Sequence, residues 1–282
     1  MSCPSVQSRK IVRIKTDYIN HESDLIVTEE PLEIVAFTPC KTKQVTVATT
    51  MRTPGNDFEL AFGILFNESI IASKSDILYI YHCPHASPEE SRVHTILQPH
   101  IPLPENKRIS VANSSCGLCG DLTLTQTYKS TFTSGTFEVS SNLIKKLPQY
   151  LRESQTLFEH TGGIHASALV SKEGEVQYIR EDIGRHNAMD KVIGACLFEN
   201  PELLSKSLMV TSSRIGYELV LKVVRARIPM IVAIGAPSHL SVQLAENAGI
   251  TLIGFAKSSG FNIYTHPYRV RTSLPTQIPH VN

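Results

Sequence analysis

Two cysteines three positions apart are the residues of this sequence best suited to chemistry. Cys116 and Cys119 lie in residues 114–120, whose sequence is SSCGLCG. No apolar periodicity would bury them, and Gly117 and Gly120 remove side-chain bulk where a reaction partner would approach the sulfur. Because a reactive cysteine needs access and a stabilised thiolate, this run predicts a sulfur-handling loop. A CxxC pair can equally bind zinc or shuttle disulfides, and its spacing alone does not choose.

A second polar cluster lies between a predicted strand and a predicted helix. Residues 180–191 contain Arg180, Asp182, Arg185 and His186. Strand ends and helix N-termini present free backbone donors to anions, and guanidinium groups bind phosphate through charge-assisted hydrogen bonds. We therefore expect an anion-binding site here, with Asp182 accepting from sugar hydroxyls or a base edge. A solvated, charged turn that caps a helix is the simpler alternative.

Three further segments suit the same kind of site. His165 follows a glycine pair, which predicts either a general acid or base or a structural hydrogen bond. Ser212 and Arg214 lie between a predicted strand and helix and favour either a phosphate cradle or a helix cap. They lack the glycine- and lysine-containing pattern of a P-loop, which argues against nucleotide hydrolysis. The last predicted parallel strand ends in Phe255, Ala256, Lys257, Ser258, Ser259 and Gly260.

Whole-chain composition narrows the class of protein. The 282 residues are 41% hydrophobic and 19% charged, which is typical of a globular chain. A formal net charge of +1 gives no global attraction to nucleic acid or an anionic membrane. Apart from the CxxC pair the cysteines are scattered, which fits a reducing compartment. Without an apolar signal segment or a membrane-length stretch, we expect a soluble, cytoplasmic protein.

Hydrophobic periodicity predicts an α/β protein with a strand-rich N-terminal subdomain, residues 1–113. After a lead-in over residues 1–30, with a short alternating run near 11–14, a helix is expected over 58–71. Strands are expected at 32–37, 45–49, 77–82, 94–97 and 109–112. Residues 114–136 then hold the CxxC loop and a Thr- and Ser-rich stretch that we expect to be mobile.

Residues 137–282 predict an α/β core domain. A helix over 143–158, broken or kinked at Pro148, comes before a hairpin of strands 166–171 and 176–180. Strands and helices then alternate through short turns, which indicates βαβ units and a parallel sheet covered on both faces. The expected strands are 208–211, 230–234 and 251–255, and the expected helices are 187–198, 215–226 and 238–248.

One further segment has the composition of a metal site. Residues 82–85 read His-Cys-Pro-His, but this spacing fits no tetrahedral zinc pattern, and no second CxxC completes four ligands. We expect no resident metal.

With these clusters in hand, the chain resembles the FdhD family, the sulfurtransferases required for formate dehydrogenase activity. The resemblance covers nearly the whole chain, and this ordered set of motifs is more specific than a CxxC alone. The segments that carry it are 29–32 (EEPL), 51–55 (MRTPG), 115–120 (SCGLCG), 161–165 (TGGIH) and 180–191 (REDIGRHNAMDK).

The resemblance implies a particular activity. A cysteine desulfurase passes sulfur to Cys116, which holds it as a persulfide, while Cys119 is a candidate for relay or resolution. The sulfur goes to the molybdenum or tungsten bis-guanine-dinucleotide cofactor, bound as cargo before its insertion into formate dehydrogenase. The cofactor-binding segment maps onto Phe255–Gly260, where Lys257-Ser258-Ser259 is less arginine-rich than the family pattern. A three-layer α/β/α core similar to cytidine deaminases and a homodimer are also implied.

Three alternative functions make different demands on the sequence. A deaminase needs an H-x-E segment followed by P-C-x-x-C, whereas here His165 is followed by Ala166 and Ser167 and the CxxC comes first. A disulfide oxidoreductase would place its CxxC at a helix start in a thioredoxin-like βαβ unit, not after a strand-rich region. A chaperone that binds the molybdenum cofactor without transferring sulfur stays open.

Overall fold

The computed structural model describes residues 5–83, 91–103, 110–112 and 137–272. Cys116 and Cys119, with the rest of the 114–136 segment, lie outside the described residues.

The N-terminal half forms a five-stranded sheet in the order β5-β6-β3-β4-β7. Its inner face is apolar: Leu32 and Ile34 are fully buried in a cluster that includes Leu60 of helix α1. The strands predicted in this half are confirmed, and β3, β4 and β6 each bury several of their side chains. The elements are β3 (Glu30–Phe37), β4 (Gln44–Arg52), α1 (Asp57–Asn67), a short 3-10 helix (Lys74–Asp76), β5 (Ile77–His82), β6 (Ser91–Leu97) and β7 (Ser110–Ala112).

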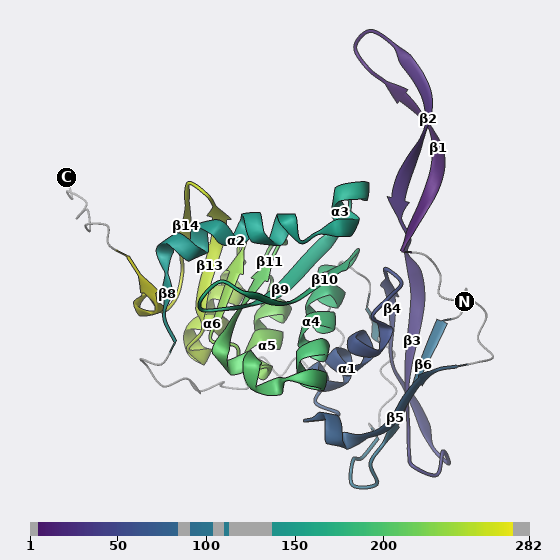
Figure 1. The fold of residues 1–282 in the computed structure, drawn as a ribbon. Helices are drawn as coiled ribbons and strands as arrows, with labels where there is room; N and C mark the ends of the chain where they lie inside the picture. The colour runs from purple at the N-terminus through teal and green to yellow at the C-terminus, as the bar shows by residue number, and fades with distance from the viewer. Residues whose placement is uncertain (1–4, 84–90, 104–109, 113–136, 273–282) are drawn as a thin grey trace.

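A long hairpin stands where the sequence predicted a lead-in with one short alternating run, near residues 11–14. Strands β1 (Val6–Ile14) and β2 (Ile19–Val27) pair antiparallel without a register break and project from the body (Figure 1). Val12, Ile14 and Ile19 are 55%, 75% and 65% exposed. Because most of this ribbon lies outside the protein's core, its sequence does not need the strict alternation on which strand prediction depends.

The C-terminal half forms a six-stranded sheet in the order β10-β9-β11-β12-β13-β14. The predicted hairpin and βαβ units are confirmed, but the sheet is mixed. Only β11, β12 and β13 run parallel, while β9, β10 and β14 pair antiparallel with their neighbours. The strands are β9 (His165–Ser171), β10 (Val176–Asp182), β11 (Ser207–Thr211), β12 (Met230–Ala233), β13 (Thr251–Lys257) and β14 (Gly260–Ile263).

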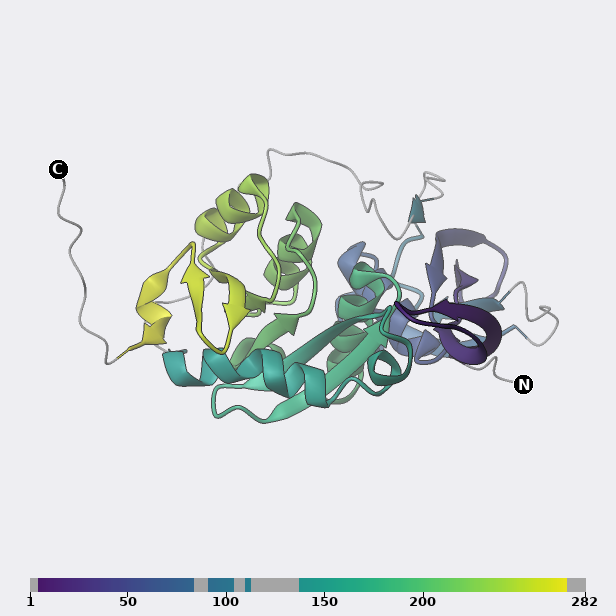
Figure 2. The same cartoon turned by 90° about the horizontal axis from the view of Figure 1, so that it is seen from above.

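Helices cover both faces of this sheet, which gives three layers (Figures 1 and 2). One face carries α4 (Arg185–Glu199), α5 (Tyr217–Arg225) and α6 (His239–Ala248), and the other carries α2 (Ser141–Glu153). Short α3 (Thr156–Thr161) follows α2. The remaining elements are β8 (Val139–Ser140), β15 (Val270–Arg271) and two 3-10 helices, Pro201–Lys206 and Pro267–Arg269.

The helix predicted over 143–158 is in fact two helices, and the break is not at the proline. Pro148 lies inside α2, and the helices part at Ser154 and Gln155. A proline inside a helix removes only its own N–H, and the helix can bend rather than end there. Burial of Ile144, Leu147 and Leu151 on one face keeps α2 continuous through Pro148.

Helices α1 and α4 join the two sheets. A Cβ added at Gly63 of α1 would lie 2.1 Å from the carbonyl oxygen of Asp190, and one at Gly194 of α4 would lie 1.9 Å from that of Glu59. Only glycine lets two backbones come this close. One hydrophobic cluster accordingly runs from Leu32 in the first sheet to Leu252 in the second.

Candidate functional site

Most of the polar segments identified in the sequence meet at one edge of the six-stranded sheet, namely the edge formed by the carboxyl ends of β10, β11 and β13. His165 begins β9 and pairs with Asp182 at the end of β10. Ser212 follows the end of β11, and its backbone N–H donates to the carbonyl of Ala166, 3.0 Å away. Phe255, near the end of β13, donates its N–H to the carbonyl of Gly235 beyond β12. Antiparallel β9 thus starts where β10, β11 and β13 end.

His165 lies among cations and hydroxyls at this edge. Its Nδ1 is 3.4 Å from Oγ of Ser212, which also accepts the N–H of Ala166 at 3.0 Å. Burial lowers the pKa of His165, and the guanidinium groups of Arg185 and Arg214 lower it further, against the effect of Asp182. Arg214 itself is exposed. The arrangement provides positive charge and a neutral imidazole, which suits an anionic ligand.

His186 is a second neutral imidazole beside the first. It lies in the first turn of α4, and its side chain is only 13% exposed. Burial, with Lys222 and Arg185, lowers its pKa to about 3, although Oε2 of Glu218 lies 3.4 Å from Nε2. At neutral pH it therefore acts as a hydrogen-bonding group rather than as a cation.

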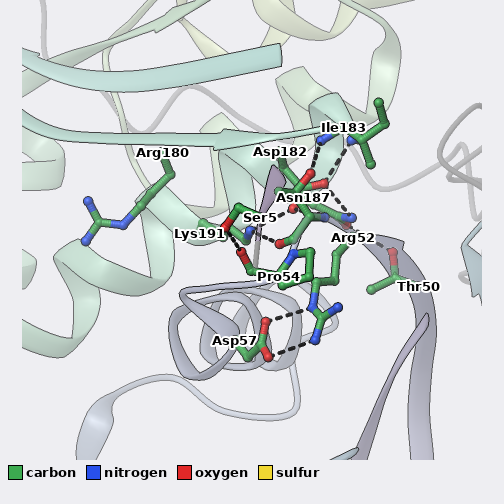
Figure 3. A network of polar contacts seen from close by, with 12 residues as sticks. Ser5, Thr50, Arg52, Pro54, Asp57, Arg180, Asp182, Ile183, Asn187 and Lys191 are labelled. Carbon is green, nitrogen blue, oxygen red and sulfur yellow. Dashed lines mark hydrogen bonds and ion pairs between the residues drawn. The ribbon is translucent and has the colours of Figure 1, made fainter. Parts of the chain in front are cut away.

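Beneath this cluster, Asp182 is the centre of a buried polar network (Figure 3). Its carboxylate is fully buried and lies 2.7 Å from Nζ of Lys191. It also accepts the backbone N–H groups of Thr53 and Gly184, at 3.2 and 2.8 Å. Lys191 in turn donates to the Thr53 carbonyl at 2.9 Å. Asp182 thereby ties the turn after β4 to the N-terminus of α4.

Arg180 points away from the cluster, toward α1. Its Nη2 donates to Oε1 of Glu59 at 2.7 Å, its Nε pairs with the other carboxylate oxygen, and its Nη1 donates to the Ile179 carbonyl. Arg180 and Asp182 therefore hold elements together, and either would have to break these contacts to reach a ligand.

The segment 255–260 forms the far end of the edge. Phe255 has a φ of 54°, in the left-handed region, and is 43% exposed. The β13–β14 ladder shifts register between Gly254 and Lys257. Non-glycine residues in this conformation are strained and gather at ligand sites. Lys257, Ser258 and Ser259 are exposed, whereas Ala256 is buried.

Sequence reasoning missed the residues that support this site from below. Arg52, in the MRTPG segment, is 2% exposed and binds both carboxylate oxygens of Asp57, at 2.8 and 3.0 Å. Glu181 accepts the N–H groups of Leu157 and Phe158 and so caps α3. For the Arg52–Asp57 pair, the one local signal in the sequence was an Arg-to-Asp spacing of five residues around a Pro-Gly turn. For the cap that Glu181 forms on α3, the sequence held no local signal.

The guanidinium, imidazole and hydroxyl groups at this edge suit an anion better than a metal cation. Within the described ranges, no three His, Cys, Asp or Glu side chains are arranged to hold a metal. The same part of the chain contains no helix of the length and apolarity that a membrane crossing requires.

Comparison with known proteins agrees with the motifs. A model of the FdhD/NarQ family matches residues 27–271. Sulfur carrier protein FdhD of Sulfurisphaera tokodaii is 41% identical over 94% of this chain and 99% of its own length. The FdhD protein of Streptomyces coelicolor is 38% identical over 94% and 95%. A crystal structure from Desulfotalea psychrophila, assigned as a formate dehydrogenase accessory protein, covers 95% of this chain with a TM-score of 0.74. At 23% identity, that structure establishes the fold alone.

Proposed function

This chain belongs to the FdhD/NarQ family, and from that premise we propose that it is a sulfurtransferase that carries sulfur as a persulfide on Cys116. A cysteine desulfurase supplies the sulfur. The acceptor is the molybdenum or tungsten bis-guanine-dinucleotide cofactor, bound as cargo before its insertion into formate dehydrogenase. The observation that carries the proposal is an SCGLCG motif in a chain that aligns along nearly its full length with sulfur carrier proteins.

The chemistry of loading is thiol exchange. The Cys116 thiolate attacks the outer sulfur of the donor's persulfide, a new S–S bond forms, and the donor cysteine leaves as a thiolate. For delivery, the Cys119 thiolate attacks Sγ of Cys116. A Cys116–Cys119 disulfide forms, and the outer sulfur leaves as sulfide, which the acceptor takes up. The pair of cysteines supplies both electrons, so no external reductant is needed for one turnover.

The edge cluster is the proposed cargo site. Arg185 and Arg214 supply charge for the pyrophosphate groups, and His165, His186 and Ser212 supply uncharged hydrogen-bonding groups. Phe255–Gly260 completes the rim, where an exposed aromatic ring and the Lys257 ammonium face solvent. Helix α4 adds the free N–H groups of its first turn.

Several finer properties follow from the same family resemblance. We infer that the three-layer core is similar to that of cytidine deaminases, that residues 1–113 and 137–282 act as two subdomains, and that the protein is a cytoplasmic homodimer. Light scattering on the purified protein would measure the dimer directly, and a monomeric mass would remove that part of the proposal.

Cys116→Ala tests the central step, with Cys119→Ala as the matched variant. After incubation with a desulfurase and cysteine, intact-mass analysis with peptide mapping should find one added sulfur on Cys116 in wild type. Cys116→Ala should take up none and should fail to activate formate dehydrogenase. Cys119→Ala should load sulfur but release it poorly. Full activation by Cys116→Ala would favour instead a chaperone that binds the cofactor without transferring sulfur.

A further inference from the structure

A buried hydrogen bond joins the two halves of the molecule immediately behind the cargo site. Oγ1 of Thr50, on β4, donates to Oδ1 of Asn187, on α4, at 3.1 Å (Figure 3). Thr50 is 2% exposed and Asn187 4%. Among the described residues, the one competing contact of this hydroxyl, to the Met51 carbonyl, is longer at 3.4 Å.

The amide of Asn187 is fixed in one orientation. Its Nδ2 donates to the carbonyl of Met51 at 2.8 Å and to Oδ1 of Asp182 at 3.2 Å. Both the oxygen and the nitrogen of the amide are therefore hydrogen-bonded. Together these hydrogen bonds set where the first turn of α4 lies relative to β4. Arg185 and His186, which face the cargo site, are the two residues before Asn187 in that turn.

Thr50 itself lies on β4, and β4 pairs with β7, the strand from which the chain continues to Cys116. Thr50 pairs with Leu32 of β3 and with Ala112 of β7. Ala112 precedes Cys116 by four positions, and four residues of chain span at most about 14 Å. A displacement of β4 against α4 therefore moves the attachment point of Cys116 relative to Arg185 and His186.

We propose that Thr50 and Asn187 are positioning residues for sulfur delivery, because their hydrogen bond sets the register between the strand that tethers Cys116 and the turn that presents Arg185 and His186 to the cargo. The inference rests on the proposed function. Fold stability has stronger supports nearby, in the Asp182–Lys191 pair between β10 and α4 and the two-pronged Arg52–Asp57 contact between β4 and α1. A single neutral hydrogen bond adds only about 1 kcal/mol, whereas a misplacement of about 1 Å can slow a reaction about a hundredfold.

Thr50→Val tests this inference, since valine keeps the shape and removes the donor. Thr46→Val is the matched control: it is the same change in the same strand, at a hydroxyl that donates to Glu33 at 2.7 Å and not to α4. Three quantities are measured for each protein. They are sulfur loading on Cys116 by mass spectrometry, GDP affinity by calorimetry, and single-turnover activation of formate dehydrogenase by persulfide-loaded protein.

We expect Thr50→Val to load sulfur and bind GDP like wild type but to deliver sulfur about tenfold more slowly. Thr50→Ser, which restores the hydroxyl, should recover delivery, and Thr46→Val should match wild type throughout. Delivery at the wild-type rate by Thr50→Val would overturn the inference. So would a parallel loss of loading, binding and thermal stability, because that pattern marks a folding role. Failure of wild type to load Cys116 would instead refute the proposed function, and this inference would fall with it.

Discussion

The charged side chains between residues 180 and 191 divide into two groups with different tasks. Arg180, Asp182 and Lys191 are paired inside the protein, with partners on α1 and on the turn after β4. Arg185 and His186 lie close enough to His165 to interact with it electrostatically. A buried charge is retained only if it is paired, so the first group holds the halves together. The second group is the one that we propose to act on a ligand.

The buried imidazole of His186 should make stability depend on pH. Its pKa is about 3 in the folded protein, against 6.5 as the ordinary value. Below pH 6.5 the unfolded chain therefore binds a proton that the folded chain refuses. Stability contributed by the neutral ring is complete above that pH and falls as the pH drops, by up to about 1.4 kcal/mol per pH unit.

Urea unfolding at several pH values between about 7 and 5 would measure this slope. His186→Gln keeps hydrogen-bonding capacity but cannot titrate, so its unfolding free energy should change less over the window. His160→Gln, at an exposed position on α3, is the control and should retain the wild-type slope. Equal slopes for wild type and His186→Gln would show that some other group dominates acid sensitivity.

At the scale of elements, α3 owes its position to a carboxylate from the neighbouring strand. Glu181 of β10 accepts the N–H groups of Leu157 and Phe158, at 2.8 and 2.9 Å. A helix of six residues has little stability of its own, so this negatively charged cap at its N-terminus matters. α3 leads through Gly162, at a φ of 68°, directly to His165.

Glu181→Gln should loosen α3 without unfolding the core. The loss of charge at the cap is expected to cost about 1 kcal/mol locally. Amide hydrogen exchange should speed up at Leu157 and Phe158, while the β9 amides stay protected. Glu159→Gln, an exposed acid in the same helix, should leave exchange unchanged. If exchange at Leu157 is the same in Glu181→Gln as in wild type, packing rather than the cap holds α3.

How far the sequence predicts such elements depends on whether burial is periodic. The strands around Leu32 and Leu169 were predictable because one or both faces are buried, and the helix through Val192 because it packs on the sheet. The β1–β2 hairpin was not, since its faces stay exposed. Sulfur chemistry at Cys116 stays a prediction from the motif, since that position lies outside the described residues. The pairing of Arg180 with Glu59 could not be predicted, because 121 positions separate them.

For the whole molecule, the crossing of α1 and α4 makes two sheets into one core. The two backbones come into contact there, at Gly63 and Gly194. The buried Asp190 next to this contact binds Asn67 of α1 and Lys222 of α5. The proposed cargo edge belongs to one half, and the strand that leads to Cys116 belongs to the other. The delivery proposed above would need the halves to stay in register, and we expect the described residues to unfold as one unit.

Gly63→Ala tests that unity. The added methyl group would meet the Asp190 carbonyl oxygen at 2.1 Å, and backbone on both sides cannot give way as a flexible side chain would. We expect a loss of at least about 2 kcal/mol in unfolding free energy, still in a single urea transition followed by circular dichroism and tyrosine fluorescence. Gly216→Ala is the control, because a Cβ there meets nothing within 4 Å. If Gly63→Ala unfolds in two separate steps, the halves are independently stable domains, and the Thr50–Asn187 contact would then be joining bodies that the core does not hold in place.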